Sequence, residues 1–241
     1  MPNNHSDFND MLLKNLDDVE SILIDVTSFT RLFLYSILNV CIQKRLKVHL
    51  VYSEPEDYTM NFAQGLEEII IMPTNPGIPD QSKKILMVLF LGWEYLRLGS
   101  LIEEWEPDKI ITLAEYSEGK REKWNQITIN QCKDIIAKSD FTKVPALNPK
   151  ETLAKLEELY SQYNAEYDIC LVNGGPKVHC FAFSEFAFKH PEVQLIYAKP
   201  YKWQQELPSE EYIEPTSRKT GNTFLFPFPI STILEKPLSS N

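Results

Sequence analysis

The sequence predicts an α/β fold: a doubly wound, mostly parallel sheet of about six strands, Rossmann-like, with a lid-like insertion after the second strand. Short apolar runs alternate along the chain with stretches of helical periodicity. One run, Ile85–Leu91, is continuously apolar, as expected of a central parallel strand covered on both faces. With 241 residues, 43% hydrophobic and 24% charged, the composition is that of an ordinary globular protein.

The chain opens with a predicted β-α-β unit. An apolar strand is expected at 21–26, a helix at 29–44 with hydroxyl residues available as its N-cap, and a second strand at 47–52. The crossover between the two strands should be right-handed and the strands parallel.

A long insertion follows the second strand. Residues 53–84 contain a short strand candidate at 69–72 and a loop, 73–79, with three prolines and a glycine. Loops of this length in compact domains are often lids or binding surfaces, so we expect a lid here.

The remaining apolar and helical stretches continue the alternation. Strands are expected at 85–91, 109–114, 168–172 and 193–197, and helices at 93–105, 117–138, 149–163 and 177–189. Together with the first unit this gives six core strands, with 69–72 as an extra candidate.

Three regions are expected along the chain. Residues 1–20 are polar and acidic and indicate a flexible N-terminus. Residues 21–203 form the Rossmann-like domain, and 204–241 form a C-terminal extension. Within that extension, 222–229 is expected to add an edge strand or to pack over the sheet.

Charge and cysteine usage narrow the class of protein. With 24 basic and 34 acidic residues the net charge is −10, which argues against nonspecific binding of nucleic acid. No apolar run is long enough for a membrane helix, and no signal peptide is evident. The four cysteines lack C-x-x-C spacing and indicate reduced, buried thiols in a cytoplasmic protein.

Ligands in open parallel sheets bind outside the carboxyl ends of the strands, and one such end is rich in glycine. Gly174 and Gly175 follow a predicted strand and allow close approach of the backbone to a ligand. Pro176 suits the first turn of a helix, whose free amides would attract an anion, and Lys177 adds a full charge. The competing interpretation is a plain turn with a solvated lysine. Neither the dinucleotide nor the phosphate-loop fingerprint is present.

The first strand carries Asp25 in an otherwise apolar run. Because a buried carboxylate is costly unless it is paired, Arg31 in the following helix is its natural partner. Thr27 and Ser28 lie between them and offer hydroxyl groups. These residues form either an Asp–Arg clamp on the turn or a polar cradle for a ligand, and the two interpretations are compatible.

Glu94 and Arg97 lie three residues apart at the start of a helix and so share one face. They form either a solvated ion pair or part of a site. If the fold is right, Arg31, Arg97 and Lys177 converge on one rim of an acidic protein. That convergence predicts an anionic small molecule, most simply a nucleotide or another phosphate ester.

No catalytic residue or cofactor is assigned from the sequence. No nucleophile–base pair stands out, and G-x-S-x-G is absent. Four carboxylates at predicted strand ends are candidates for holding magnesium: Asp25, Glu54, Glu94 and Glu115.

Several of these segments together resemble a family of prokaryotic Rossmann-like proteins similar in layout to the CRISPR-associated Rossmann-fold (CARF) nucleotide sensors. The segments are Asp25–Arg31, Tyr52–Pro55, Leu91–Glu94 with Arg97, Glu106–Asp108, Gly174–Lys177, His190–Val193 and Tyr197–Pro200. The order Gly175-Pro176-Lys177 differs from the Gly-[Ser/Thr]-Lys-Pro usual in that family. The resemblance spans residues 21–203 and implies a nucleotide sensor from a defence locus.

Three functions follow as expectations. The first is a sensor or accessory subunit of a prokaryotic defence assembly that binds a nucleotide-type anion and acts through a protein partner or a homo-oligomer. The second is a metal-assisted nucleotide hydrolase or transferase that uses the same strand-end site. The third is a purely structural subunit that docks through an apolar face built from the aromatic segment 224–228.

Overall fold

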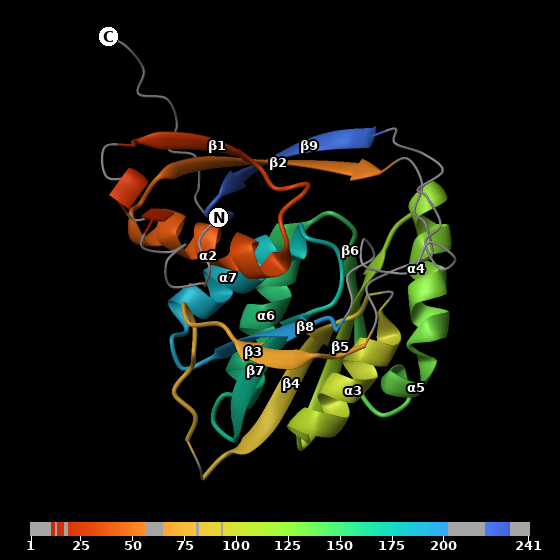
Figure 1. The fold of residues 1–241 in the computed structure, drawn as a ribbon. Helices are drawn as coiled ribbons and strands as arrows, with labels where there is room; N and C mark the ends of the chain where they lie inside the picture. The colour runs from red at the N-terminus through yellow and green to blue at the C-terminus, as the bar shows by residue number, and fades with distance from the viewer. Residues whose placement is uncertain are drawn as a thin grey trace.

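The computed structural model describes residues 11–12, 14–16, 19–55, 65–80, 82–92, 94–201 and 220–231. In this part of the chain the elements stack in four layers, a small sheet, helices, a large sheet and further helices (Figure 1).

The large sheet has six strands and is mostly parallel. Its order is β3-β8-β7-β4-β5-β6, and only β3 is antiparallel to its neighbour. The strands are β3 (Glu68–Ile71), β4 (Lys84–Phe90), β5 (Lys109–Tyr116), β6 (Asp140–Pro145), β7 (Tyr167–Asn173) and β8 (Gln194–Lys199).

The small sheet joins the two ends of the described chain. β1 (Ser21–Asp25) runs parallel to β2 (Lys47–Pro55), and β9 (Thr220–Phe228) runs antiparallel to β2 on its other side. This sheet lies over α2 and α7, and the large sheet lies on the opposite side of those helices (Figure 1).

The helices fill the layers on both faces of the large sheet (Figure 1). Those facing the small sheet are α2 (Arg31–Gln43), α6 (Pro149–Tyr163) and α7 (His179–Lys189). Those on the other face are α3 (Tyr95–Trp105), α4 (Lys120–Gln131) and α5 (Lys133–Ile136).

Two hydrophobic clusters hold the layers together. The larger one packs α2 and α7 against both sheets and includes Leu50 of the small sheet and Phe90 of the large one. The smaller one packs the other face of β4, through Met87 and Leu89, against Leu98 of α3. Because alternate β4 side chains enter different clusters, this strand is buried on both faces.

The predicted fold class is confirmed: helices cover both faces of a mostly parallel, six-stranded sheet. Its strand membership differs from the expectation, since 21–26 and 47–52 form the separate small sheet. The burial of β2 gives the reason. Val48 and Leu50 are buried, whereas Lys47 and His49, which alternate with them, are exposed. Such alternation belongs to a sheet with one uncovered face.

Two other strands complete the large sheet. The candidate at 69–72 is present as β3, while β6 was not predicted. β6 has the sequence Asp-Phe-Thr-Lys-Val-Pro and lies at the sheet edge, where polar residues and proline are tolerated. The single helix expected at 117–138 is divided into α4 and α5 at Cys132.

The insertion and the C-terminal segment are described in part. Within the expected lid, β3 pairs with β8, and residues 72–80 form a loop without regular structure, as expected, that bonds to β8 and to the turn before it. Residues 56–64 lie outside the described residues. Residues 220–228 form an edge strand as expected, on the small sheet. Among the described residues, no helix has the length and apolarity needed to cross a membrane.

Candidate functional site

Three turns that follow strands carry the predicted site residues. Asp25, Thr27 and Ser28 come at the end of β1, and Arg31 is the first residue of α2. Glu94 and Arg97 stand at the start of α3, after β4. Gly174, Gly175 and Lys177 connect β7 to α7. β4 and β7 are neighbours, so their turns lie at the same edge of the large sheet.

Arg31 caps the turn after β7. Its Nη2 donates to the carbonyl oxygens of Gly174, at 3.2 Å, and of Gly175, at 2.5 Å. The expected clamp between Arg31 and Asp25 is therefore wrong, because the guanidinium reaches across to the other sheet. Arg31 thus joins the β1–α2 connection to the β7–α7 connection.

Asp25 is exposed rather than buried. It occupies an outward position of the small sheet, where alternate side chains face away from the helices. Its carboxylate accepts from the backbone amide of Thr27 at 2.9 Å. Hydrogen bonds from Thr27, helped by the charge of Lys177, lower the pKa of Asp25. Ser28 is exposed beside this turn.

The two glycines are required by close packing. A Cβ on Gly175 would lie 2.5 Å from the Phe90 ring, and one on Gly174 would lie 2.9 Å from Leu98. Their amides already have acceptors, because Gly174 donates to the carbonyl of Phe90 and Gly175 to the side chain of Asn173. These two amides are therefore not available to an anion, whereas the expectation concerned the first-turn amides of the helix that follows.

Lys177 bridges the two sheets from the opposite direction. Its ammonium donates to the carbonyl oxygen of Thr27, in the turn after β1. Burial and the nearby charge of Arg31 lower the pKa of Lys177 to about 8, although Asp25 partly offsets them. An ammonium has three protons, and this bond uses one of them.

Glu94 and Arg97 form a forked ion pair. Nη1 of Arg97 donates to Oε1 of Glu94 at 2.9 Å, and Nη2 donates to Oε2. The pair is mostly buried, with side chains 14% and 5% exposed. The alternative of a solvated surface pair is therefore wrong. Desolvation, and then the charge of Arg31, lower the pKa of Arg97 against the opposing effect of Glu94.

The three predicted cations are brought together. Arg31 acts electrostatically on both Arg97 and Lys177, and like charges at such range repel. Nε of Arg31 and Nε of Arg97 are buried and have no hydrogen-bond partner among the described residues. This cluster, defined as Arg31, Arg97 and Lys177, is called the cationic cluster below. Its charge and unused donors suit an anionic group.

A second polar network was not predicted. Glu115, at the end of β5, accepts from Nε2 of His179 at 2.6 Å and from Arg121 at 2.8 Å. Arg121 also donates to Glu54 of β2 at 2.5 Å, and Nδ1 of His179 lies 2.8 Å from the hydroxyl of Thr152. Burial would raise the pKa of Glu115, but the His179 hydrogen bond and the charges of His179 and Arg121 lower it to about 2.

This network contains a hydroxyl, an imidazole and a carboxylate in the order of a hydrolytic triad. However, Thr152 and His179 are fully buried, and the imidazole stacks on the Phe90 ring at 4.1 Å between centroids. A nucleophile needs room for a substrate beside it. The triad-like arrangement is therefore structural: it fixes α6, α7 and β5 relative to one another.

The four carboxylates considered for magnesium are separately engaged. Glu94 is paired with Arg97, Asp25 accepts from Thr27, and Glu54 and Glu115 share Arg121. Within the described ranges, no group of three or more His, Cys, Asp or Glu side chains is placed to hold a metal ion.

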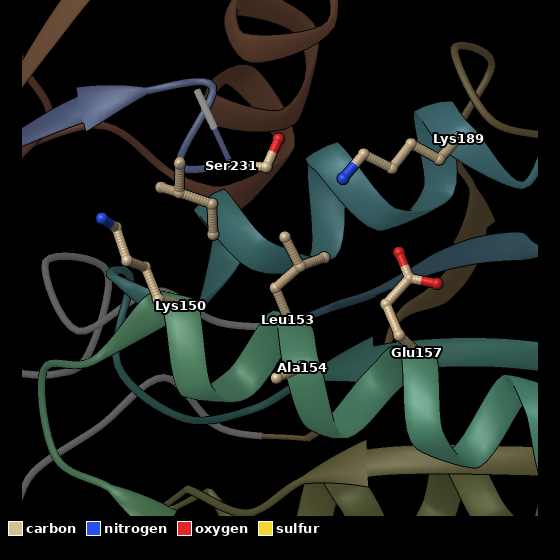
Figure 2. Close-up of a pocket in the computed structure, with 7 residues that line it drawn as sticks. Lys150, Leu153, Ala154, Glu157, Lys189 and Ser231 are labelled. Atoms are coloured by element: carbon tan, nitrogen blue, oxygen red, sulfur yellow. The ribbon is translucent and has the colours of Figure 1, made fainter. Parts of the chain in front are cut away.

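One pocket lies away from the predicted site. It has a volume of about 330 Å³ and lies between α6, α7 and the segment after β9, with Lys150 and Lys189 at its rim (Figure 2). Leu153, Ala154 and Ile230 supply its apolar lining. Glu185, which is buried nearby, accepts from the backbone amide of Ile230 at 2.6 Å. No motif in the sequence predicted this pocket.

The aromatic segment considered as a docking face is largely part of the core. Phe228 is buried, and Phe224 and Phe226 are partly buried against the larger hydrophobic cluster. Leu225, between them, is 61% exposed on the outer face of the small sheet.

Comparison with known proteins assigns the chain to no family. No protein-family model matches the chain, and no curated protein matches it.

Proposed function

We propose that the protein binds a nucleotide-type anion at the cationic cluster. The observation that carries this proposal is the meeting of Arg31, Arg97 and Lys177, from three different turns, on a protein of net charge −10. A cluster of like charges lowers stability unless something offsets it; Glu94 offsets part of the charge, and a bound phosphate would offset more. Arg97 is 5% exposed, and its Nε–H group still has no hydrogen-bond partner among the described residues. This group is a hydrogen-bond donor for the proposed anion.

The resemblance of the sequence to the CARF nucleotide sensors extends the proposal. On that basis the protein is a sensor or accessory subunit of a prokaryotic defence assembly, and its output passes to a protein partner or to a second copy. A magnesium-dependent hydrolase is less well supported, because both oxygens of Glu94 are held by Arg97.

A thermal-shift screen tests the proposal. The purified protein is heated with AMP, ADP or cyclic AMP, each with and without magnesium. A nucleotide at a hundred times its dissociation constant adds about 2.7 kcal/mol to the free energy of unfolding. For a chain of this size we expect a rise in Tm of several degrees.

Lys177→Ala is the diagnostic variant. Because hydrogen bonds to charged groups are worth about 1.5–3 kcal/mol, we expect nucleotide affinity to fall at least tenfold. Lys155→Ala is the matched control, since Lys155 lies on α6 and pairs with Glu158. A flat screen, or equal affinity of the Lys177 and Lys155 variants, would reject the proposed site.

A further inference from the structure

Two ties run from the start of α7 to the small sheet. The first is direct: Lys177 donates to the carbonyl oxygen of Thr27 in the turn after β1. The second begins two residues later at His179, passes through Glu115 and Arg121, and ends on Glu54 of β2. Both therefore join the head of one helix to the same end of the small sheet.

The strands at that end are also tied to each other. The amide of Ser53 donates to the hydroxyl of Thr27 at 3.0 Å, and the amide of Val26 donates to the carbonyl of Val51 at 2.9 Å. Asn222 of β9 approaches Glu54 at 3.4 Å. A change in the position of Thr27 would therefore displace the ends of β1 and β2 together.

Lys177 belongs to one of these ties and to the cationic cluster. Its neighbour Arg31 disfavours the charged ammonium, and a bound phosphate would favour it. Because one proton serves Thr27 and two remain, the ammonium can hold an anion without releasing the carbonyl. Anion binding would then strengthen the bond to Thr27.

We propose that the small sheet is the element that reports occupancy of the cationic cluster: anion binding tightens its attachment to α7 through Lys177 and Thr27. This inference rests on the proposed function, because it requires an anion at that site. By linkage, what tightens the small sheet must also strengthen anion binding. Glu54 therefore acts as a positioning residue for the site. It acts on the start of α7 through Arg121, Glu115 and His179.

Hydrogen exchange on the parent protein is the first measurement. The probe is whichever of AMP, ADP and cyclic AMP gives the largest thermal shift. We expect the probe to slow exchange in peptides that contain the Val26, Phe29 and Ser53 amides. Peptides from α5, which carries no residue of the cationic cluster or of the two ties, should exchange as before.

Glu54→Gln is the second measurement, by titration calorimetry with the same nucleotide. The variant keeps the size of the side chain and weakens its bond to Arg121, so we expect affinity to fall about fivefold. Glu158→Gln, which alters an exposed pair on α6, should bind as the parent does.

The outcomes separate the two proposals. Slower exchange at the small sheet with weaker binding by Glu54→Gln supports the inference. If the parent binds through Lys177 but exchange at the small sheet is unchanged, the inference fails and the site stands. If none of the three nucleotides binds the parent, both proposals fail.

Discussion

The ammonium group of Lys177 is largely buried. It donates to the carbonyl oxygen of Thr27 and lies near the guanidinium of Arg31. Its lowered pKa, about 8, means that it begins to lose its charge only slightly above neutral pH. A nucleotide phosphate is already fully ionised there, since its second pKa is about 6. Between pH 7 and 9.5, the lysine should therefore dominate the pH dependence of anion binding.

We expect nucleotide affinity to be nearly constant around pH 7, where the phosphate is ionised and the lysine is charged, and to fall as pH rises through about 8, by up to about tenfold per pH unit. The sign follows because deprotonation removes the positive charge that the anion contacts. Lys177→Arg stays charged throughout this range and should give a flat profile. Titration calorimetry from pH 6.5 to 9.5 measures both, and parallel curves for parent and variant would contradict the assignment.

Residue identity predicted the convergence of charges but not their contacts. Arg97 and Lys177 could be brought together because each follows a strand of the same parallel sheet, whose strand ends share one edge. Arg31 follows β1 of the small sheet, so its approach to the other two does not follow from that rule. The partner of Arg31 could not be predicted. Sequence proximity favours the carboxylate of Asp25, whereas the actual acceptors, the carbonyl oxygens of Gly174 and Gly175, lie 143 and 144 residues away. The network around Glu115 has no motif spacing and was missed for the same reason.

At the scale of elements, the burial pattern of each segment identifies its layer. α2 is buried without interruption from Leu34 to Cys41, and α7 from His179 to Ala187. Helices that are apolar all round lie between two covering layers. The uninterrupted burial of α2 and α7, together with the alternating burial in β2, therefore indicates a second sheet above these helices. The pattern gives no strand pairing, so β9 could be expected only as an edge strand somewhere.

The end of β9 is anchored by Glu185 of α7, which accepts from the amides of Ile230 and Ser231 at 2.6 and 3.2 Å. Glu185→Ala should lower the free energy of unfolding by about 2–4 kcal/mol, because it leaves the amides of buried Ile230 and of Ser231 without their acceptor. Lys189→Met is the control: it removes a 40% exposed ammonium paired with Glu185, and should cost less than about 1 kcal/mol. Urea unfolding compares the two, and equal losses would contradict this role.

At the scale of the whole molecule, Glu115 joins the large sheet to α4 and α7 and, through Arg121, to the small sheet. The carboxylate is 4% exposed, and its pKa in the folded protein, about 2, lies below the ordinary value of 4.5. The folded state therefore favours the ionised form, and this contribution to stability is fully present above about pH 4.5.

As pH falls from about 4.5 to about 2, that contribution of about 3 kcal/mol should be lost. Glu115→Gln cannot titrate, so its free energy of unfolding should be lower than the parent's at neutral pH and should change less across this window. Urea unfolding at intervals from pH 6 to 3 measures the difference. If the free energy of unfolding falls equally with pH in the parent and the variant, Glu115 is not the source of the acid-dependent loss of stability.

The pairing of β2 with β9 has a consequence for synthesis. Val48 leaves the ribosome early, and its partner Phe228 is among the last described residues to emerge. Until then, one edge of β2 has no strand beside it, and unpaired edges recruit other chains. The large sheet needs no residue beyond Lys199 and can form first. Maturation of the nascent chain should therefore end with the closing of the small sheet, the element that carries Thr27 and Glu54.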